Sequence, residues 1–274
     1  MEKLINEFLI EIKKGKKYST LSDEIIVEEI KEYLRKNNRV IKIDKQSVKE
    51  IRSKLHRLYS SYLRGKKNRR VKLLEELKKS PGNVEIIEKI LSTAVSTKER
   101  LQYYNEIYKE IFEITGKPKT IIDLGAGINP VSYIYMKEVG INSLSYYSYD
   151  IDISDINFLN DYFQIMKTQG LNGKAQILNV RNLEEISNLP SSDIIFMFKL
   201  IDLINTNNHK PGEELIKNLS LKTKYIVVSF STNTISGKPM NLPRRKGFEL
   251  MLERVNLKFK VLKIPGEVFY VINR

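Results

Sequence analysis

The chain has 274 residues, of which 41% are hydrophobic, and a formal net charge of +14. This apolar content excludes a disordered chain, and the absence of cysteine excludes disulfides, cysteine nucleophiles and thiolate zinc sites. No apolar run approaches the ~20 residues of a membrane span, only 2 histidines are present, and the charged N-terminus lacks a secretory signal. We therefore expect a cytoplasmic protein without a metal site.

The first part of the chain is predicted to be helical throughout. Apolar side chains recur at helical spacing in six stretches. The last three helices are expected near 68–79, 83–93 and 96–115. Thr20 with Asp23, and Ser96 with Glu99, have the spacing of capping boxes at helix starts. Because Gly and Pro interrupt the pattern at 116–118, we predict an all-helical N-terminal domain over 1–115 that docks on RNA.

The remainder, residues 116–274, alternates between strand and helix patterns. Such alternation predicts a mostly parallel sheet covered on both faces. The last two strands are connected through Lys263-Ile264-Pro265-Gly266, a segment too short for a crossover helix, so they should pair antiparallel. This combination is typical of the class I (Rossmann-like) S-adenosylmethionine-dependent methyltransferase sheet, an α/β fold. Strands are expected near 119–124, 144–149, 174–179, 192–198, 224–230, 257–263 and 267–272.

A glycine turn follows the first expected strand. Asp123 ends the β-branched run, and Gly125 and Gly127 come next, before a residue that can open a helix. Glycines allow a ligand to approach the backbone closely, and a helix start offers free N–H groups. Asp150 ends the second expected strand, where a carboxylate can accept hydrogen bonds from both hydroxyls of a ribose. Together these residues predict an adenosine-containing cofactor.

The same turn distinguishes between cofactors. Pro130 stands where the dinucleotide fingerprint has its third glycine, and no phosphate-binding G-x-x-x-x-G-K-[ST] motif occurs. S-adenosylmethionine has no phosphates and fits better. Asp123 is then expected near its amino-acid part and Asp150 near its ribose.

Several segments, in this order and at this spacing, resemble one family, the aminoglycoside-resistance 16S rRNA guanine-N7 methyltransferases. These enzymes methylate a guanine in the decoding site of the small ribosomal subunit. The resemblance runs, with gaps, from about residue 45 to 248. The segments that carry it are Lys54–Leu63, Ser96–Leu101, Tyr108, Ile111–Phe112, Gly127–Pro130, Phe198–Asp202, Val227–Thr232 and Ser236–Lys238.

The resemblance implies that S-adenosyl-L-methionine is the cofactor and that 16S rRNA, in the small ribosomal subunit, is the partner. Arg100 resembles the family arginine near the cofactor carboxylate. Asn179 replaces an acid that often follows the third strand, and its amide can still contact the adenine. The expected cofactor-binding residues are Arg100, Asp123, Gly125, Gly127, Asp150 and Asn179.

Methyl transfer to guanine N7 needs little acid–base chemistry, because N7 carries a free in-plane lone pair. Catalysis can come from positioning and desolvation. The target base must leave its stack, and Phe198 and Phe230, at the ends of the fourth and fifth expected strands, are candidate walls of its pocket. Ordinary core packing explains both rings equally well. Lys199 is a candidate contact to the flipped nucleotide or its phosphate, with a solvated loop lysine as the alternative.

Three basic clusters are candidate contacts to RNA phosphates, which position RNA without reading its sequence. The second cluster, near the N-terminus, is Lys13, Lys14, Lys16 and Lys17. The predicted RNA-binding residues of the first and third clusters are Arg64, Lys66, Lys67, Arg69, Arg70, Lys238, Arg244 and Arg245.

Two alternatives remain open from sequence. The acceptor could be another RNA or another base nitrogen, or the chain could be a non-catalytic RNA-binding assembly factor with a methyltransferase-like domain. The intact glycine turn and Asp150 argue against the second. We expect a monomer, because a large RNA substrate needs no second copy.

Overall fold

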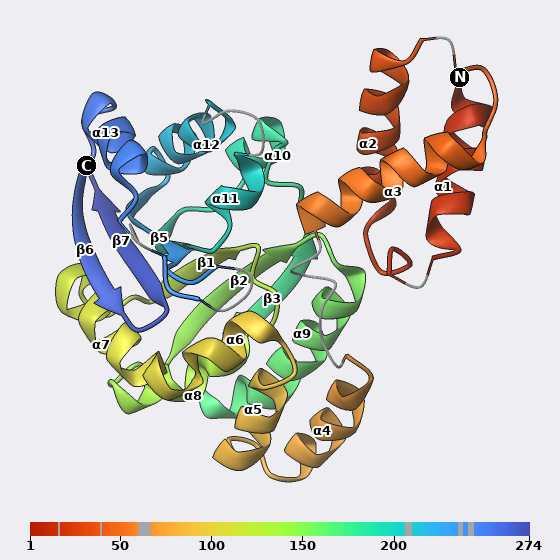
Figure 1. Ribbon diagram of the computed structural model, residues 1–274. Coiled ribbons are helices and arrows are strands. Elements are labelled where there is room, and N and C mark those ends of the chain that lie inside the picture. The colour runs from red at the N-terminus through yellow and green to blue at the C-terminus, as the bar shows by residue number, and fades with distance from the viewer. Residues whose placement is uncertain (16, 39, 60–66, 206–209, 235–237, 241–243) are drawn as a thin grey trace.

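The computed structural model describes the whole chain except residues 16, 39, 60–66, 206–209, 235–237 and 241–243. Three helices at the N-terminus stand apart from a larger α/β part (Figure 1). These helices, here called the three-helix unit, are α1 (Glu2–Lys13), α2 (Asp23–Lys36) and α3 (Lys45–Tyr59).

The three-helix unit has a hydrophobic core of its own. Phe8 and Ile12 on α1 and Ile26 and Ile30 on α2 lie four residues apart, so each pair shares one helix face, and Leu55 of α3 completes the contact. All five side chains are fully buried. The unit is therefore a small packed body and not an extension of the α/β part.

A seven-stranded sheet forms the centre of the α/β part, with the strand order β3-β2-β1-β4-β5-β7-β6. β7 is antiparallel to both β5 and β6, and the remaining pairs are parallel. This confirms the predicted class I methyltransferase sheet. The strands are β1 (Thr120–Leu124), β2 (Leu144–Asp150), β3 (Leu171–Ile177), β4 (Ser192–Phe198), β5 (Thr223–Ser231), β6 (Lys258–Ile264) and β7 (Glu267–Asn273).

Alternate residues of the strands face two separate layers of helices. Ile121 and Phe196 pack with one layer, and Ile122 and Ile195 pack with the other. The first layer is α4 (Asn68–Lys79), α5 (Val84–Leu91), α6 (Val95–Arg100), α7 (Tyr104–Thr115), α8 (Tyr133–Glu138) and α9 (Ile153–Met166), with short 3-10 turns at Leu101–Tyr103, Asn129–Ser132 and Lys167–Gln169. The second layer is α10 (Leu183–Ser187), α11 (Ile201–Ile204), α12 (Lys210–Ser220) and α13 (Lys246–Arg254).

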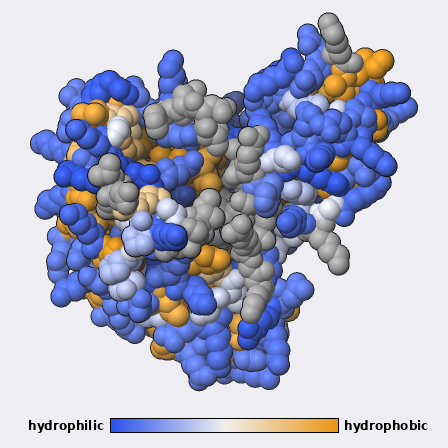
Figure 2. Space-filling model, in the orientation of Figure 1, coloured by the Kyte–Doolittle hydropathy of each residue, from blue (hydrophilic) through white to orange (hydrophobic). Residues whose placement is uncertain are grey.

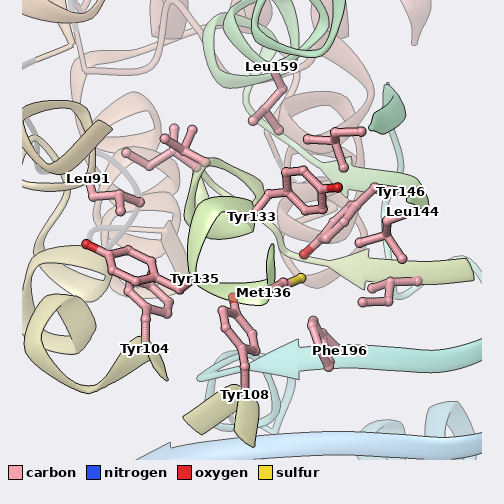
Figure 3. Packing of buried hydrophobic residues seen from close by; sticks show 14 of the residues in the cluster. Leu91, Tyr104, Tyr108, Tyr133, Tyr135, Met136, Leu144, Tyr146, Leu159 and Phe196 are labelled. Atoms are coloured by element: carbon pink, nitrogen blue, oxygen red, sulfur yellow. The ribbon is translucent and has the colours of Figure 1, made fainter. Parts of the chain in front are cut away.

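The helices α4–α7 share the core of the sheet and not that of the three-helix unit. Figure 3 shows Tyr108 of α7 beside Phe196 of β4, and their ring centroids lie 6.3 Å apart. Leu77 of α4 and Ile90 of α5 belong to the same buried cluster. The predicted boundary after residue 115 therefore does not separate two cores. Packing divides the chain between α3 and α4, because the apolar faces of α4–α7 cover the sheet.

Both predicted capping boxes differ from the structure. Ser22 precedes α2 and Ala94 precedes α6, and neither makes a side-chain cap. The hydroxyl of Thr20 instead donates to Asp152, and the carboxylate of Glu99 pairs with Lys199. These side chains bind partners far away in the sequence, which local spacing cannot reveal. Over the described residues, no helix is long and apolar enough to cross a membrane.

Candidate active site

The glycine turn after β1 is fixed by hydrogen bonds to the end of β2. The amides of Gly125 and Ala126 donate to the Tyr149 carbonyl at 2.8 and 3.1 Å. Gly125 and Gly127 have φ angles of 66° and 50°, a region that favours glycine. A Cβ atom at Gly127 would meet nothing within 4 Å. The backbone is therefore open on this side, as close approach of a ligand requires.

Asp150 ends β2 beside this turn. Its Oδ2 accepts a hydrogen bond from the amide of Gly127 at 2.8 Å, and its Oδ1 accepts from the amides of Ile151 and Asp152. Burial, with the nearby charge of Asp155, raises the pKa of Asp150 to about 7. The carboxylate thus lies where a ribose is expected, and hydrogen-bond donors would favour its ionised form.

Asp123 lies on β1 and begins a buried polar network. Its Oδ2 accepts from Asn129 Nδ2 at 2.9 Å and from the Tyr146 hydroxyl at 2.8 Å. Burial raises the pKa of Asp123 to about 6, although both hydrogen bonds oppose the rise. Asn129 Oδ1 in turn accepts from Arg100 at 3.3 Å and from Tyr104 at 3.2 Å. Asn129 therefore connects Asp123 to the predicted cofactor arginine.

Glu267, which the sequence reading missed, is the partner of Arg100. The Arg100 Nε–Glu267 Oε2 distance is 2.9 Å, and both side chains are buried. Glu267 also accepts a hydrogen bond from the Ser229 hydroxyl and lies 3.3 Å from the Lys199 ammonium. A signal existed, since an acid opens an otherwise apolar strand immediately after Pro265-Gly266.

Lys199 is held tightly just after β4. Its φ of 56° is uncommon for a residue with a side chain, and such strain clusters at functional sites. Its amide donates to the Ser229 carbonyl and hydroxyl, both at 3.0 Å, and its ammonium pairs with Glu99 at 2.6 Å. The structure therefore gives Lys199 a fixed backbone and two carboxylate partners, unlike an ordinary solvated loop lysine.

The two phenylalanine candidates lie in the core. Phe198 is 6% exposed and Phe230 is 2% exposed. The Arg100 guanidinium lies 5.0 Å from the Phe198 ring centroid, and the Arg245 guanidinium lies 5.0 Å from that of Phe230. In this conformation neither ring can stack on a base. Both rings are therefore explained by ordinary core packing, because neighbouring side chains cover the strand ends that carry them.

A small cavity opens beside Asp150, where an adenine is expected. Its walls come from the turn after β1, the loop after β3 and α11. Asn179 lines it and is 9% exposed, and its amide donates to Glu28 of the three-helix unit. The apolar lining residues are Leu178, Val180, Leu200, Leu203 and Ile204.

The structure separates the RNA-binding candidates of the first cluster. Arg70 is 3% exposed and bonds to Asp155 at 2.6 Å, so the prediction that it contacts RNA is corrected to a structural role. The Lys67 ammonium lies 2.6 Å from the Asp152 carboxylate, so its charge is also paired within the protein. Arg69 is exposed. The run of basic residues does not predict one RNA-binding surface here, because one face of α4 packs on α9 while the next faces solvent. Lys16, Arg64 and Lys66 lie outside the described residues.

The third basic cluster lies between β5 and α13. Lys238 is exposed, and Arg244 is exposed and paired with Glu249 at 2.6 Å. Arg245 binds Asp202 at 3.0 Å and covers Phe230. Exposed cations thus lie beside the carboxyl edge of the sheet, where ligands bind in open α/β folds.

Comparison with known proteins gives consistent matches over most of the chain. A 16S rRNA (guanine(1405)-N(7))-methyltransferase of Proteus mirabilis is 29% identical over 248 residues, covering 84% of this chain and 85% of the relative. The corresponding protein of Micromonospora echinospora is 27% identical over 237 residues, covering 83% and 82%.

Solved structures show the same fold. The 16S rRNA methyltransferase RmtF in complex with S-adenosyl-L-homocysteine has a TM-score of 0.76 at 21% identity, covering 100% of this chain and 99% of its own. The 16S rRNA methylase RmtB has a TM-score of 0.72 at 22% identity, covering 98% of both chains. The family model described as ribosomal RNA methyltransferase (FmrO) matches residues 15–271. Because that match spans nearly the whole chain, the chain belongs to the FmrO family of ribosomal RNA methyltransferases.

Proposed function

We propose that this protein transfers a methyl group from S-adenosylmethionine to N7 of a guanine in 16S rRNA, at the position that its relatives' names give as 1405. One observation carries the proposal. In a chain of this family, the glycine turn, the ribose-type acid Asp150 and the Asp123–Asn129–Arg100 network lie together at the carboxyl edge of the sheet.

The residues at this edge fit the cofactor. Asp150 would accept hydrogen bonds from the ribose hydroxyls, and the cavity beside Asn179 suits an adenine. The open backbone at Gly127 and the network around Asp123 and Arg100 suit the amino-acid part. When bound, the cofactor supplies an electrophilic methyl group on a positively charged sulfur.

The protein's own contribution is positioning. Guanine N7 is neutral and already nucleophilic, so no group must remove a proton before attack. The described edge accordingly offers buried hydrogen-bonding networks and no histidine beside the site. Lys199 is fixed in place by Ser229, Glu99 and Glu267, and its ammonium can bind a phosphate or a base oxygen of the target nucleotide. The bound small ribosomal subunit would exclude water from the site.

Substrate docking is proposed to use the exposed cations. Arg69 on α4 and Lys238 with Arg244 near the sheet edge are available to phosphates, and the net charge of +14 attracts RNA. The substrate would be the small ribosomal subunit in the cytoplasm, and a monomer suffices to bind it.

Labelled methyl transfer to purified small subunits, followed by digestion and nucleoside mass spectrometry, tests the proposal. We expect 7-methylguanosine as the labelled product. Asp150→Ala is the matched control and should lose the product. Circular dichroism must show that it folds, because the change also leaves the amides of Gly127, Ile151 and Asp152 without their acceptor. Cofactor binding by the wild type without any labelled nucleoside would instead favour the non-catalytic assembly factor. A different methylated base would show that the acceptor is not guanine N7.

A further inference from the structure

The three-helix unit contacts the α/β part at the loop that follows Asp150. Leu21 pairs with Asp152 as an isolated antiparallel bridge. The Ser22 amide donates to the Ile151 carbonyl at 3.0 Å, and the Ile153 amide donates to the Thr20 carbonyl at 2.8 Å. Ile151 lines the cavity beside Asp150 and also packs on the core of the three-helix unit. One wall of the cofactor pocket is therefore tied to this unit.

A second contact reaches the loop after β3, on another wall of the same cavity. Glu28 and Glu29 of α2 point to this loop. Glu28 accepts a hydrogen bond from Asn179, and Glu29 Oε1 lies 3.0 Å from the Arg181 guanidinium. The Glu29 side chain is only 2% exposed and that of Arg181 is 23% exposed, so the carboxylate of this ion pair is removed from water.

Arg181 connects two walls of the cavity to each other. Its guanidinium donates to the Leu203 carbonyl of α11 at 3.4 Å, and its amide donates to Asn179 Oδ1 at 3.1 Å. Glu29 holds the same guanidinium. The position of the three-helix unit therefore affects the distance between the loop after β3 and α11.

The charge balance makes this contact sensitive to the placement of the three-helix unit. Lys54 of α3 lies 2.5 Å from Glu29 and 2.6 Å from Glu32. Removing one partner from a buried ion pair is costly, because the remaining charge is left without compensation. If the unit moved away from the α/β part, Glu29 would keep Lys54 but lose Arg181, and Arg181 would lose its only ion-pair partner among the described residues.

The three-helix unit also carries a basic cleft of its own. Four cations and two acids line a hollow between α1 and α3, which therefore keeps a net positive charge: Lys17, Lys45, Lys49, Arg52, Glu11 and Asp44. In the face seen in Figure 2, the surface of this unit is mainly hydrophilic. The cations of the hollow suit RNA phosphates. The unit can therefore bind substrate through these cations while α2 holds the cofactor pocket.

We propose that Glu29 is a positioning residue that couples the two events, so that RNA docking on the three-helix unit and S-adenosylmethionine binding strengthen each other through Arg181. The inference rests on the proposed function. Thermodynamic linkage makes the coupling reciprocal, so it can be measured from the cofactor side alone.

The test compares Glu29→Gln with Glu32→Gln by calorimetric titration with S-adenosylmethionine. Both changes remove a carboxylate that pairs with Lys54, but only the first touches Arg181. We expect Glu29→Gln to weaken cofactor binding at least about fivefold, the lower end of typical coupling factors, and Glu32→Gln to leave it unchanged. A further readout is the wild-type cofactor Kd with small subunits at saturation, which should fall, while that of Glu29→Gln should not.

Equal cofactor affinity in the two variants, both folded by circular dichroism, would overturn the inference. If Glu29→Gln does not fold, Glu29→Asp replaces it, with Glu32→Asp as its control, because both keep a charge beside Lys54 and only the first draws a carboxylate back from Arg181. Glu29→Asp should then weaken cofactor binding and Glu32→Asp should not, and equal affinities overturn the inference as before. A wild type that binds no cofactor would contradict the proposed function itself, which is a distinct outcome.

Discussion

At the scale of single residues, the two buried carboxylates of the site stand out. Burial raises the pKa of Asp150 to about 7 and that of Asp123 to about 6, far above the ordinary range of aspartate. A free protein therefore keeps Asp150 partly protonated near neutral pH. Ribose hydroxyls would donate to the ionised carboxylate, so binding must release that proton.

This predicts a rise in cofactor affinity with pH. Between pH 6 and pH 8 the ionised fraction of a group with a pKa of about 7 grows about tenfold, and affinity should rise by a similar factor. Calorimetric titration across this range provides the measurement. Asp150→Asn is the control, because it keeps the titration of Asp123 and of the ligand amine. Identical pH profiles in both proteins would contradict the assignment of Asp150.

Glu267 provides the second residue-scale prediction. Glu267→Gln leaves Arg100 without its buried counter-charge, and we expect the free energy of unfolding to fall by about 3 kcal/mol. Urea denaturation measures this. In the matched change, Glu99→Gln, an exposed partner of Lys199 is lost, which should cost less than about 1 kcal/mol. Equal losses would show that the Arg100–Glu267 pair is no more important than a surface pair.

At the scale of elements, α4 shows how one helix can divide its arginines between two roles. Arg70 faces Asp155 and Thr93 in the interior, and the adjacent Arg69 faces solvent. A run of basic residues in the sequence suggests a single surface, but successive side chains on a helix point in different directions. Only the packing of α4 on α9 decides which arginine remains for RNA.

Substitution of Arg70 should therefore affect stability, and substitution of Arg69 should affect RNA binding. Arg70→Ala should destabilise the protein by about 3 kcal/mol, because Asp155 stays buried without this partner. Arg69→Ala should leave the unfolding transition in place and weaken binding to small subunits. Thermal unfolding measures the stability of both variants, and filter binding measures their affinity for small subunits. If Arg69→Ala were the destabilising change, the division of roles on α4 would be reversed.

Element type and order could be predicted well from sequence, and contacts between elements could not. The 2- and 3.6-residue periods identify the strands and helices, and the short connection between the last two strands indicates the antiparallel hairpin, which the structure confirms. The start of β3 at Leu171 was missed because its first residues alternate weakly. Glu267 and Glu29 act through partners more than 100 residues away, and no local pattern encodes such pairs.

At the scale of the whole molecule, charge and architecture point to the same substrate. The net charge of +14 is spread over a three-helix unit and an α/β part that meet at the cofactor pocket. The family gives the acceptor as ribosomal RNA. A positive charge of this size favours contacts to the phosphate backbone of folded RNA.

Such binding should depend steeply on salt. Each phosphate contact releases a counterion, so the logarithm of the affinity for small subunits should fall linearly as the logarithm of salt concentration rises. Reversing the charge of Lys238 and Arg244 together should reduce that slope. Binding measured between about 50 and 300 mM salt tests this, because counterion release changes the affinity by orders of magnitude over that span. An affinity that does not respond to salt would contradict docking through phosphates.

The most direct test of the central claim is to map the methylated position. Purified small subunits are incubated with the protein and S-adenosylmethionine, the RNA is cleaved chemically at 7-methylguanine, and the product is read by primer extension. We predict a single new stop, at the guanine that the relatives' names number 1405, which is absent with Asp150→Ala. No stop there, from a wild type that binds the cofactor, would contradict the claim.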